Sequence, residues 1–179
     1  PIWMRKTVSL AQEHGVGIGA HPSYPDLNGF GRRNMAATPE EVRNDVVYQA
    51  GALSAFTAEK RLQHVKPHGA MYNQAVNDVE LGKSICEAVL EVQSDAVLLA
   101  LSGSKWIDVA EGLGMRVARE VFADRAINSD GTLVSRSLPG SVIHDTSEVV
   151  ERSLLMVKEG KIRSVQGVEV EVMADSICL

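Results

Sequence analysis

The stretch "AVLLALSG", residues 96–103, is apolar on both faces of a strand. Such a strand is typical of a parallel sheet that helices cover on both sides. Helical periodicity is predicted on either side of it, at about 79–92 and 105–111. Outward from this stretch, further strands are predicted at 16–21, 62–69, 116–124 and 174–179. The alternation predicts βαβ units with right-handed crossovers, and hence a parallel sheet, either open or closed into a barrel.

Local signals set the ends of two further helices. In "TPEE", Thr38 is the expected N-cap, Pro39 occupies the first helical position and Glu41 completes a capping box, so a helix is predicted from there to about residue 56. "DTSE", residues 145–148, is a second capping-box candidate, and Gly160 is expected to end that helix. A hairpin is predicted to follow it, around residues 166–167.

Composition and charge limit the class of protein. A chain of 179 residues, 45% hydrophobic and 23% charged, can bury one core, so residues 1–179 are predicted to form a single domain. A net charge of -5 argues against a nucleic-acid partner. The chain has neither a long apolar run nor a leader pattern, so we expect no membrane partner and a cytoplasmic location. Cys86 and Cys178 lie in apolar patterns and are expected to be reduced, buried thiols.

The carboxyl ends of parallel strands meet at one edge, where α/β proteins bind their ligands. Polar residues end the predicted strands there: His21, then Lys66 and His68, then residues 102–104, then residues 120–125. In the first strand, Gly17 and Gly19 share a face with His21, which suggests empty space for a ligand or a close backbone approach.

The next two strand ends carry charge on one face. His64, Lys66 and His68 alternate on the second strand, and Glu120 and Asp124 share a face of a later one. A buried ammonium group is costly without a partner, so these acids either offset the positive charge in a functional cleft or form a purely structural network with it. For His64, a ring satisfied by a backbone carbonyl is the expected interpretation.

Two loops are candidate anion sites. "NGFGRRN", residues 28–34, offers glycines that permit positive φ, together with Arg32 and Arg33, whose forks suit carboxylate or phosphate. "SGSKW", residues 102–106, ends a strand before a helix and is expected to present free amide donors. An ordinary tight turn is the alternative for both loops.

Five blocks carry a resemblance to a known family: "GAHPSYPDLNGFGRRN", "HVKPHGAMYN", "EVFADRA", "LVSR" and "ADSICL". In this order and at these spacings, the chain resembles the family of 5-oxoprolinase A subunits, also called the LamB/YcsF lactam-utilisation family, over essentially its whole length. The resemblance implies an irregular seven-stranded β/α barrel related to polysaccharide deacetylases. Family motifs of the types "NCDLGE", "FHAGD" and "HGD" do not occur, so we expect the barrel to lack its first strands and its C-terminal end.

The resemblance also implies an activity. It indicates one component of an ATP-dependent hydrolase that, with the B and C subunits, opens the lactam of 5-oxoproline to L-glutamate. ATP is the expected co-substrate, with Mg, no tightly bound metal is predicted, and a homo-oligomer is compatible with this interpretation. Phosphorylation of the lactam oxygen followed by attack of water is the expected route. It requires cationic groups at the developing negative charge and a base for water.

On this basis the catalytic set is His21 or His68 for acid/base work, Lys66 for negative charge, and Glu120 or Asp124 for water. Substrate and anion binding are assigned to Tyr24, Arg32, Arg33, Asn73, Arg125, Arg136 and Asp175. Two rival functions remain open. One is a metal-dependent amide hydrolase of deacetylase type, with His21, His68 and an acid such as Asp124 as ligands. The other is a non-catalytic subunit that holds substrate for its partners.

Overall fold

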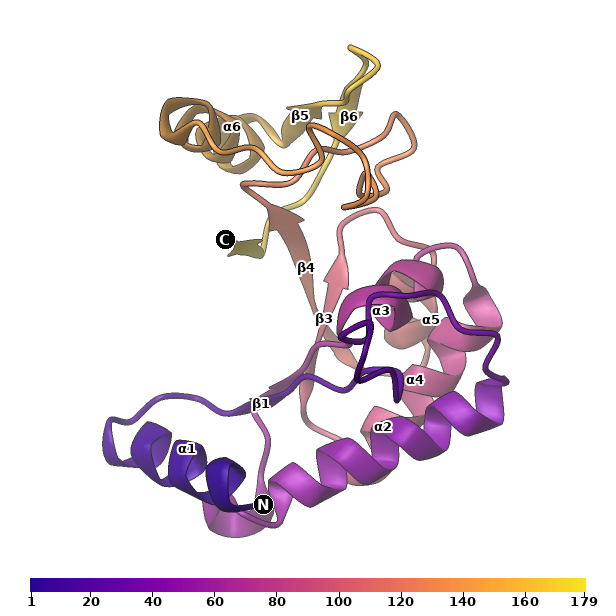
Figure 1. Ribbon diagram of the computed structural model, residues 1–179, viewed down its shortest axis with the longest axis vertical. Coiled ribbons are helices and arrows are strands. Elements are labelled where there is room, and N and C mark those ends of the chain that lie inside the picture. The colour runs from indigo at the N-terminus through magenta and orange to yellow at the C-terminus, as the bar shows by residue number, and fades with distance from the viewer. The chain divides into compact units, whose positions relative to one another are not determined.

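The computed structural model describes residues 1–179, which divide into two compact units. Unit one comprises Pro1–Leu99 and Lys105–Val117, and unit two comprises Ala100–Ser104 and Ala118–Leu179. Figure 1 shows the helices and strands of both. No helix is long and apolar enough to cross a membrane.

The strands of unit one pair in parallel. β1 (Gly19–Ala20) pairs with β2 (His64–Val65), which pairs with β3 (Val97–Leu101), whose last two residues belong to unit two. The first two are shorter than predicted, but their hydrogen bonding extends beyond the regular strands, from the Gln63 amide with the Ile18 carbonyl to the His68 amide with the Pro22 carbonyl. The predicted strand pairing is therefore present over most of its expected length.

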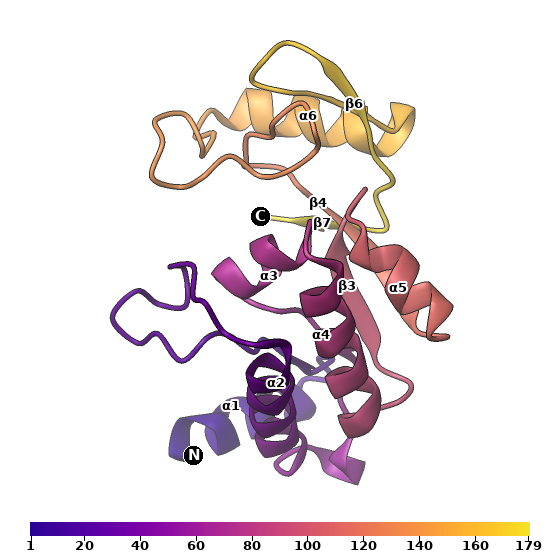
Figure 2. The same cartoon turned by 90° about the vertical axis from the view of Figure 1, so that its right-hand side faces the viewer.

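The helices of unit one follow their sequence signals. α2 (Pro39–Ser54), α4 (Val79–Val92) and α5 (Trp106–Gly112) lie where the sequence predicts them, and α1 (Ile2–Glu13) precedes β1. Thr38 and Glu41 form the predicted capping box of α2, with both reciprocal hydrogen bonds. α2 buries Val42, Val46 and Ala50 and packs along α4, as Figure 2 shows. Two short elements were not predicted, η1 (Ala58–Lys60) and α3 (Gly69–Ala75).

Unit two contains parallel and antiparallel pairs. β4 (Arg116–Phe122), whose first two residues belong to unit one, pairs in parallel with β7 (Ser176–Cys178), while β5 (Lys161–Arg163) and β6 (Glu169–Glu171) form the predicted hairpin. α6 (Thr146–Glu159) ends at Gly160, which adopts φ 64° as predicted. At its N-terminus, one of the two hydrogen bonds of the predicted capping box is present: the Asp145 side chain accepts a hydrogen bond from the Glu148 amide.

A small hydrophobic cluster holds unit two together. It consists of Val121, Ile127, Met156 and Ile162, with Leu133, Val170, Val172 and Ala174 packed against it. Val121 lies in this cluster, so Glu120 and Phe122 on either side of it point to the opposite face of β4. This agrees with the predicted alternation of that strand.

The parallel α/β class is confirmed, and so is the number of five strands in parallel pairs. The closed seven-stranded barrel, its relation to deacetylases and the single domain stay predictions. Cys86 and Cys178 are free, and Cys86 is fully buried, which raises the pKa of its thiol to about 12. Cys178 is only half-buried.

Candidate functional site

Parallel pairing brings the ends of β1 and β2 together in unit one. The Lys66 amide donates to the Ala20 carbonyl at 2.9 Å, and the His68 amide donates to the Pro22 carbonyl at 2.8 Å. His21 and His68 therefore leave neighbouring strands at the same edge. This is the carboxyl-end edge at which the sequence predicts a site.

The two histidine rings contact each other directly. Nδ1 of His68 lies 2.9 Å from Nε2 of His21, with the ring planes at 82°. The outer nitrogens meet backbone carbonyls: Nδ1 of His21 lies 2.5 Å from the Lys66 oxygen, and Nε2 of His68 lies 2.8 Å from the Phe30 oxygen. All four ring nitrogens thus have a partner within the protein.

Positive charge surrounds this histidine pair. The pKa of His21 lies below its usual value, chiefly because burial disfavours the imidazolium. The hydrogen bond from its ring to the Lys66 carbonyl opposes this, whereas the charges of His68, Lys66 and His64 lower the pKa further. The three basic residues that alternate on the second strand therefore all act on His21.

Side chains fill the space beside Gly17 and Gly19, so the prediction of empty space there is wrong. A Cβ on Gly19 would overlap the ring of His64, and one on Gly17 would overlap the side chain of Gln63. His64 Nδ1 lies 3.2 Å from the Gln63 side-chain oxygen, so one partner of this ring is a side chain, and the expected carbonyl partner stays a prediction. The glycines make room for neighbouring side chains of β2.

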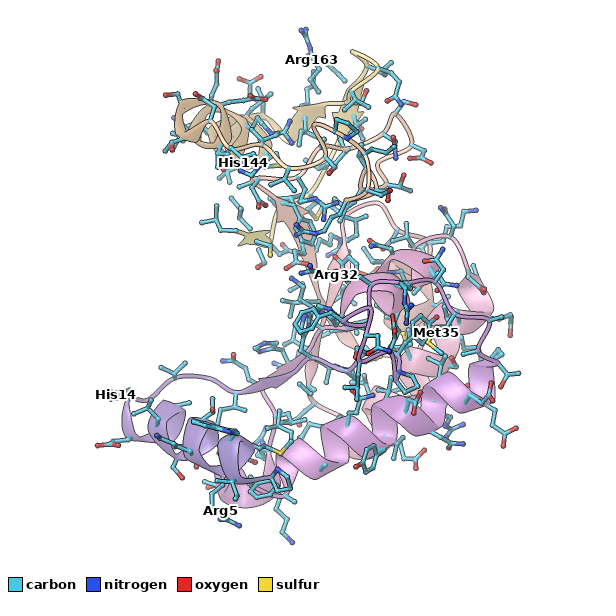
Figure 3. The ribbon with its side chains drawn as sticks, viewed as in Figure 1. Arg5, His14, Arg32, Met35, His144 and Arg163 are labelled. Carbon is cyan, nitrogen blue, oxygen red and sulfur yellow. The ribbon has the colours of Figure 1, made fainter.

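Phe30 was not predicted from the sequence. Its side chain is 67% exposed, and its backbone has φ 54°, which is uncommon for a residue with a Cβ. The ring stands edge-on to His68, with centroids 5.2 Å apart. The guanidinium carbon of Arg32, labelled in Figure 3, lies 5.2 Å from the centroid of the same ring. An aromatic residue between Gly29 and Gly31 was the signal in the sequence that could have identified it.

Arg33 is engaged by a buried carboxylate. Asp26, whose side chain is 5% exposed, accepts a 2.9 Å hydrogen bond from Arg33 Nε, another from its Nη2, and one from the Gly29 amide at 2.9 Å. These bonds, with that from the Arg33 side chain the largest, hold the pKa of Asp26 at about 2. Arg33 thus stabilises the loop, whereas the exposed Arg32 contacts the Phe30 ring.

Two other predicted residues of unit one lie in different surroundings. Tyr24 is 2% exposed and belongs to the core. Its pKa is raised by burial and, to a lesser degree, by the charge of Asp78. Asn73 is exposed on α3.

The other predicted residues belong to unit two. Glu120 is 2% exposed on β4, and the backbone oxygen of Asp124 accepts a 2.8 Å hydrogen bond from the Ile143 amide. Arg125, assigned to substrate, is 4% exposed and donates to the Ser141 and Val134 carbonyls at 3.1 and 2.6 Å. The Arg125 guanidinium therefore holds the loop that follows β4.

Arg136 is exposed on that same loop. Asp175 accepts a 2.9 Å hydrogen bond from the Arg119 amide and lies 3.5 Å from the Arg119 guanidinium.

Arg152 of α6 is a further residue that the sequence did not indicate. It donates to the backbone oxygens of Ala123 and Arg125, at 3.4 and 2.7 Å, and so bonds to both neighbours of Asp124. Burial lowers the pKa of Arg152, against the opposing charges of Glu148 and Asp124. An arginine within a helical pattern has no sequence signal for this role, because its acceptors are backbone atoms of a distant loop.

Three of the amides of "SGSKW" that were expected to be free are occupied. The amides of Ser102, Ser104 and Lys105 donate to the carbonyls of Glu120, Leu101 and Val76, at 2.9, 3.0 and 3.2 Å. The Ser102 hydroxyl accepts a hydrogen bond from the Met173 amide. This turn is structural.

One family model, described as the LamB/YcsF family, matches residues 1–179 in full. The chain belongs to the LamB/YcsF family. The resemblance inferred from the five sequence blocks is thereby confirmed.

Relatives within this family carry informative names. The A subunit of 5-oxoprolinase from Pyrococcus horikoshii is 53% identical over 181 residues, covering 100% of this chain and 71% of the relative. That of Alkaliphilus metalliredigens is 54% identical, with the same coverage. The crystal structure of the lactam utilization protein from Thermus thermophilus is 47% identical with a TM-score of 0.88, covering 98% of this chain and 72% of that one. The LamB/YcsF fold thus extends over almost the whole chain.

Proposed function

We propose that this chain acts as the A subunit of an ATP-dependent 5-oxoprolinase. In this role it cleaves the lactam of 5-oxo-L-proline to L-glutamate, coupled to ATP hydrolysis and together with the B and C subunits. The names of its relatives support this proposal, because they are 5-oxoprolinase subunits and a lactam utilization protein.

The observation that carries the proposal is the histidine pair with its surroundings. A lactam amide is unactivated, so its cleavage needs acid/base groups and cations near the oxygen that gains negative charge. His21 and His68 contact each other at the strand edge, and the charge of Lys66 acts on His21. Lys66 is the cation assigned to the phosphorylated or oxyanionic lactam oxygen.

Phe30 and Arg32 fit the rest of this substrate. 5-Oxoproline is a small flat ring with one carboxylate. The exposed Phe30 ring offers an apolar surface for that ring, and the guanidinium of Arg32 beside it suits a carboxylate. Since Arg33 is held by Asp26, Arg32 is the arginine assigned to the substrate.

Of the rival functions, a metal-dependent hydrolase is less well supported. A ligand histidine directs a ring lone pair at the metal, whereas the rings of His21 and His68 direct their nitrogens at each other and at two carbonyls. The charge of Lys66 next to these rings is also unfavourable to a bound cation.

The deciding experiment measures 5-oxoproline-dependent ATP hydrolysis by this chain with and without the B and C subunits. We expect turnover only with the partners present. Lys66→Met should abolish it while leaving assembly intact, and Lys83→Met, at an exposed position of α4, serves as the matched control. Normal turnover by Lys66→Met contradicts the role of Lys66. Binding of 5-oxoproline without turnover in the complete assembly supports the non-catalytic rival, and loss of activity after chelation, restored by a transition metal, supports the metal-dependent one.

A further inference from the structure

The hydrogen bonds of the histidine pair fix where two ring protons lie. A carbonyl oxygen only accepts hydrogen bonds, so the nitrogen that faces it must carry the hydrogen. Nδ1 of His21 faces the Lys66 oxygen, and Nε2 of His68 faces the Phe30 oxygen. Each of these two nitrogens is therefore protonated.

The contact between the rings requires a third proton. A neutral imidazole has one N–H, so neutral His21 would present a lone pair at Nε2, and neutral His68 would present one at Nδ1. These two nitrogens lie 2.9 Å apart, which is a hydrogen-bond distance. Two facing lone pairs repel each other, so a proton must lie between them. The pair then holds three ring protons and carries one positive charge.

We propose that His21 and His68 share this third proton and work as one acid/base unit, which delivers it to the lactam nitrogen of the substrate. The second half of this statement rests on the proposed function, whereas the proton count rests on geometry alone.

The surroundings keep the pair at a single positive charge. A fourth proton would place two N–H groups face to face and two imidazolium ions in contact. The charges of Lys66 and His64 act on His21, and the Arg32 guanidinium contacts the Phe30 ring, so the neighbouring charged groups are basic. Burial first, and then these charges, lower the pKa of His21, so they oppose the third proton as well as a fourth, whereas the hydrogen bond to the Lys66 carbonyl favours protonation. The third proton is therefore inferred from the contact between the rings.

The loop between β1 and α2 fixes the carbonyl that orients His68. The Gly31 oxygen accepts a 2.9 Å hydrogen bond from the Ala70 amide, and a Cβ on Gly69 would lie 2.5 Å from that oxygen. The loop that carries Phe30 is therefore packed against the first turn of α3. The tautomer of His68 is set by this packing and does not depend on the substrate.

The proton balance of the proposed step closes. As the carbon–nitrogen bond of the lactam breaks, the nitrogen keeps the bonding electrons and takes the shared proton. The oxygen of the attacking water bonds to the carbon of the phosphorylated lactam, and one proton of that water replaces the proton the pair has given. Ring opening leaves an acyl phosphate, which a second water hydrolyses to the carboxylate and inorganic phosphate. The pair thus passes from three ring protons to two and returns to three.

Nuclear magnetic resonance of the chain with ¹⁵N-labelled histidine counts these protons. We expect ring signals for protonated Nδ1 of His21 and protonated Nε2 of His68, with a third, strongly deshielded proton coupled to both rings. His21→Gln and His68→Gln should each remove the third signal, and His14→Gln, at the exposed end of α1 labelled in Figure 3, should retain it. One N–H per ring overturns the shared proton. So does a shift of both rings on addition of Zn²⁺ that a chelator reverses.

Kinetics of the enzyme assembled with the B and C subunits test the catalytic half of the proposal, which is the delivery of the shared proton to the lactam nitrogen. We expect kcat for 5-oxoproline to fall by about 100-fold or more in each single variant, with KM little changed. The fall in kcat in the double variant should be no larger than in either single variant, because the rings act as one unit. Losses that multiply in the double variant, or single losses of only a few-fold, overturn the role. If the wild type turns over no 5-oxoproline, the proposed function fails with this half, and the magnetic resonance result still decides the shared proton.

Discussion

The imidazole of His64 fills the space next to the α-carbon of Gly19, because the two residues are partners in the parallel pairing of β1 with β2. A methyl group at Gly19 would overlap that ring. We expect Gly19→Ala to lower the free energy of unfolding by about 1–3 kcal/mol, the usual cost of overpacking. Urea denaturation followed by circular dichroism measures the change.

A double-mutant cycle with His64→Ala isolates this contact. If the ring is the obstacle, Gly19→Ala should cost much less in the His64→Ala background than in the wild type. An equal cost in both backgrounds would mean that the alanine acts through the backbone or through another neighbour.

The same pair shows what strand alternation in the sequence can and cannot predict. Alternation correctly separates the faces of β1 and marks Gly19 as a place where a side chain is absent for a reason. It cannot say what occupies the space, because that depends on the rotamer of a residue 45 positions away. The sequence pattern is the same whether the space beside such a glycine is empty or filled by a neighbouring side chain.

The buried carboxylate of Asp26 should make the chain sensitive to strong acid. Its pKa is about 2 in the folded chain, against an ordinary 3.8, so its stabilising contribution is complete above 3.8 and is lost as the pH falls towards 2. Asp26→Asn should lower the free energy of unfolding at neutral pH. It should also reduce the dependence of that free energy on pH between these two values, which we call the acid limb. Unfolding measured by urea at a series of pH values gives both quantities.

Asp108→Asn, at an exposed position of α5, is the matched control for this series. It should leave the acid limb unchanged. If Asp26→Asn has the same acid limb as the wild type, the Asp26–Arg33 pair does not contribute to stability in the way proposed.

Arg152 should be required for the order of the loop after β4. Arg152→Met leaves the Ala123 and Arg125 carbonyls without their guanidinium donor, at a cost of about 1–3 kcal/mol in the free energy of unfolding. Arg163→Met, exposed on β5 and labelled in Figure 3, removes an arginine of the same unit and should have little effect. Hydrogen exchange of the Ile143 amide, which bonds to the Asp124 carbonyl, reports on the loop directly. Unchanged protection of that amide in Arg152→Met would rule out this role.

The sequence predicted the elements whose signals are local. The Thr38 box and Gly160 mark helix ends through their own backbone chemistry, and the apolar residues of 96–103 indicate a covered parallel strand. α3 was missed; it begins at Gly69, which is the last residue of the strand predicted at 62–69.

In the candidate site, too, some features follow from local sequence and others depend on the folded chain. Parallel pairing predicts that His21 and His68 end neighbouring strands, since the register of such strands brings their carboxyl ends together. The role of Arg152 was not predictable, because its guanidinium bonds to backbone oxygens far along the chain. Phe30 had a signal, an aromatic residue between two glycines, but its contact with the His68 ring depends on the fold. Position along a strand is a local property, whereas the partner of a ring or a guanidinium is a property of the folded chain.

The shared proton of the histidine pair should give stability a maximum near neutral pH. Counted beyond the one proton of each neutral ring, two unfolded histidines hold two extra protons well below about pH 6.5 and none well above it. The folded pair holds one extra proton, the shared third one. Below this pH the unfolded chain therefore binds more protons and stability rises with pH; above it the folded chain binds more and stability falls.

The difference between the unfolding free energies of the wild type and the His21→Gln, His68→Gln double variant, measured from pH 5 to pH 8, removes the contributions of all other groups. We expect this difference to peak near about pH 6.5. A difference that only rises with pH would mean that both rings are neutral in the folded chain. The 2.9 Å contact between Nδ1 of His68 and Nε2 of His21 would then hold no proton.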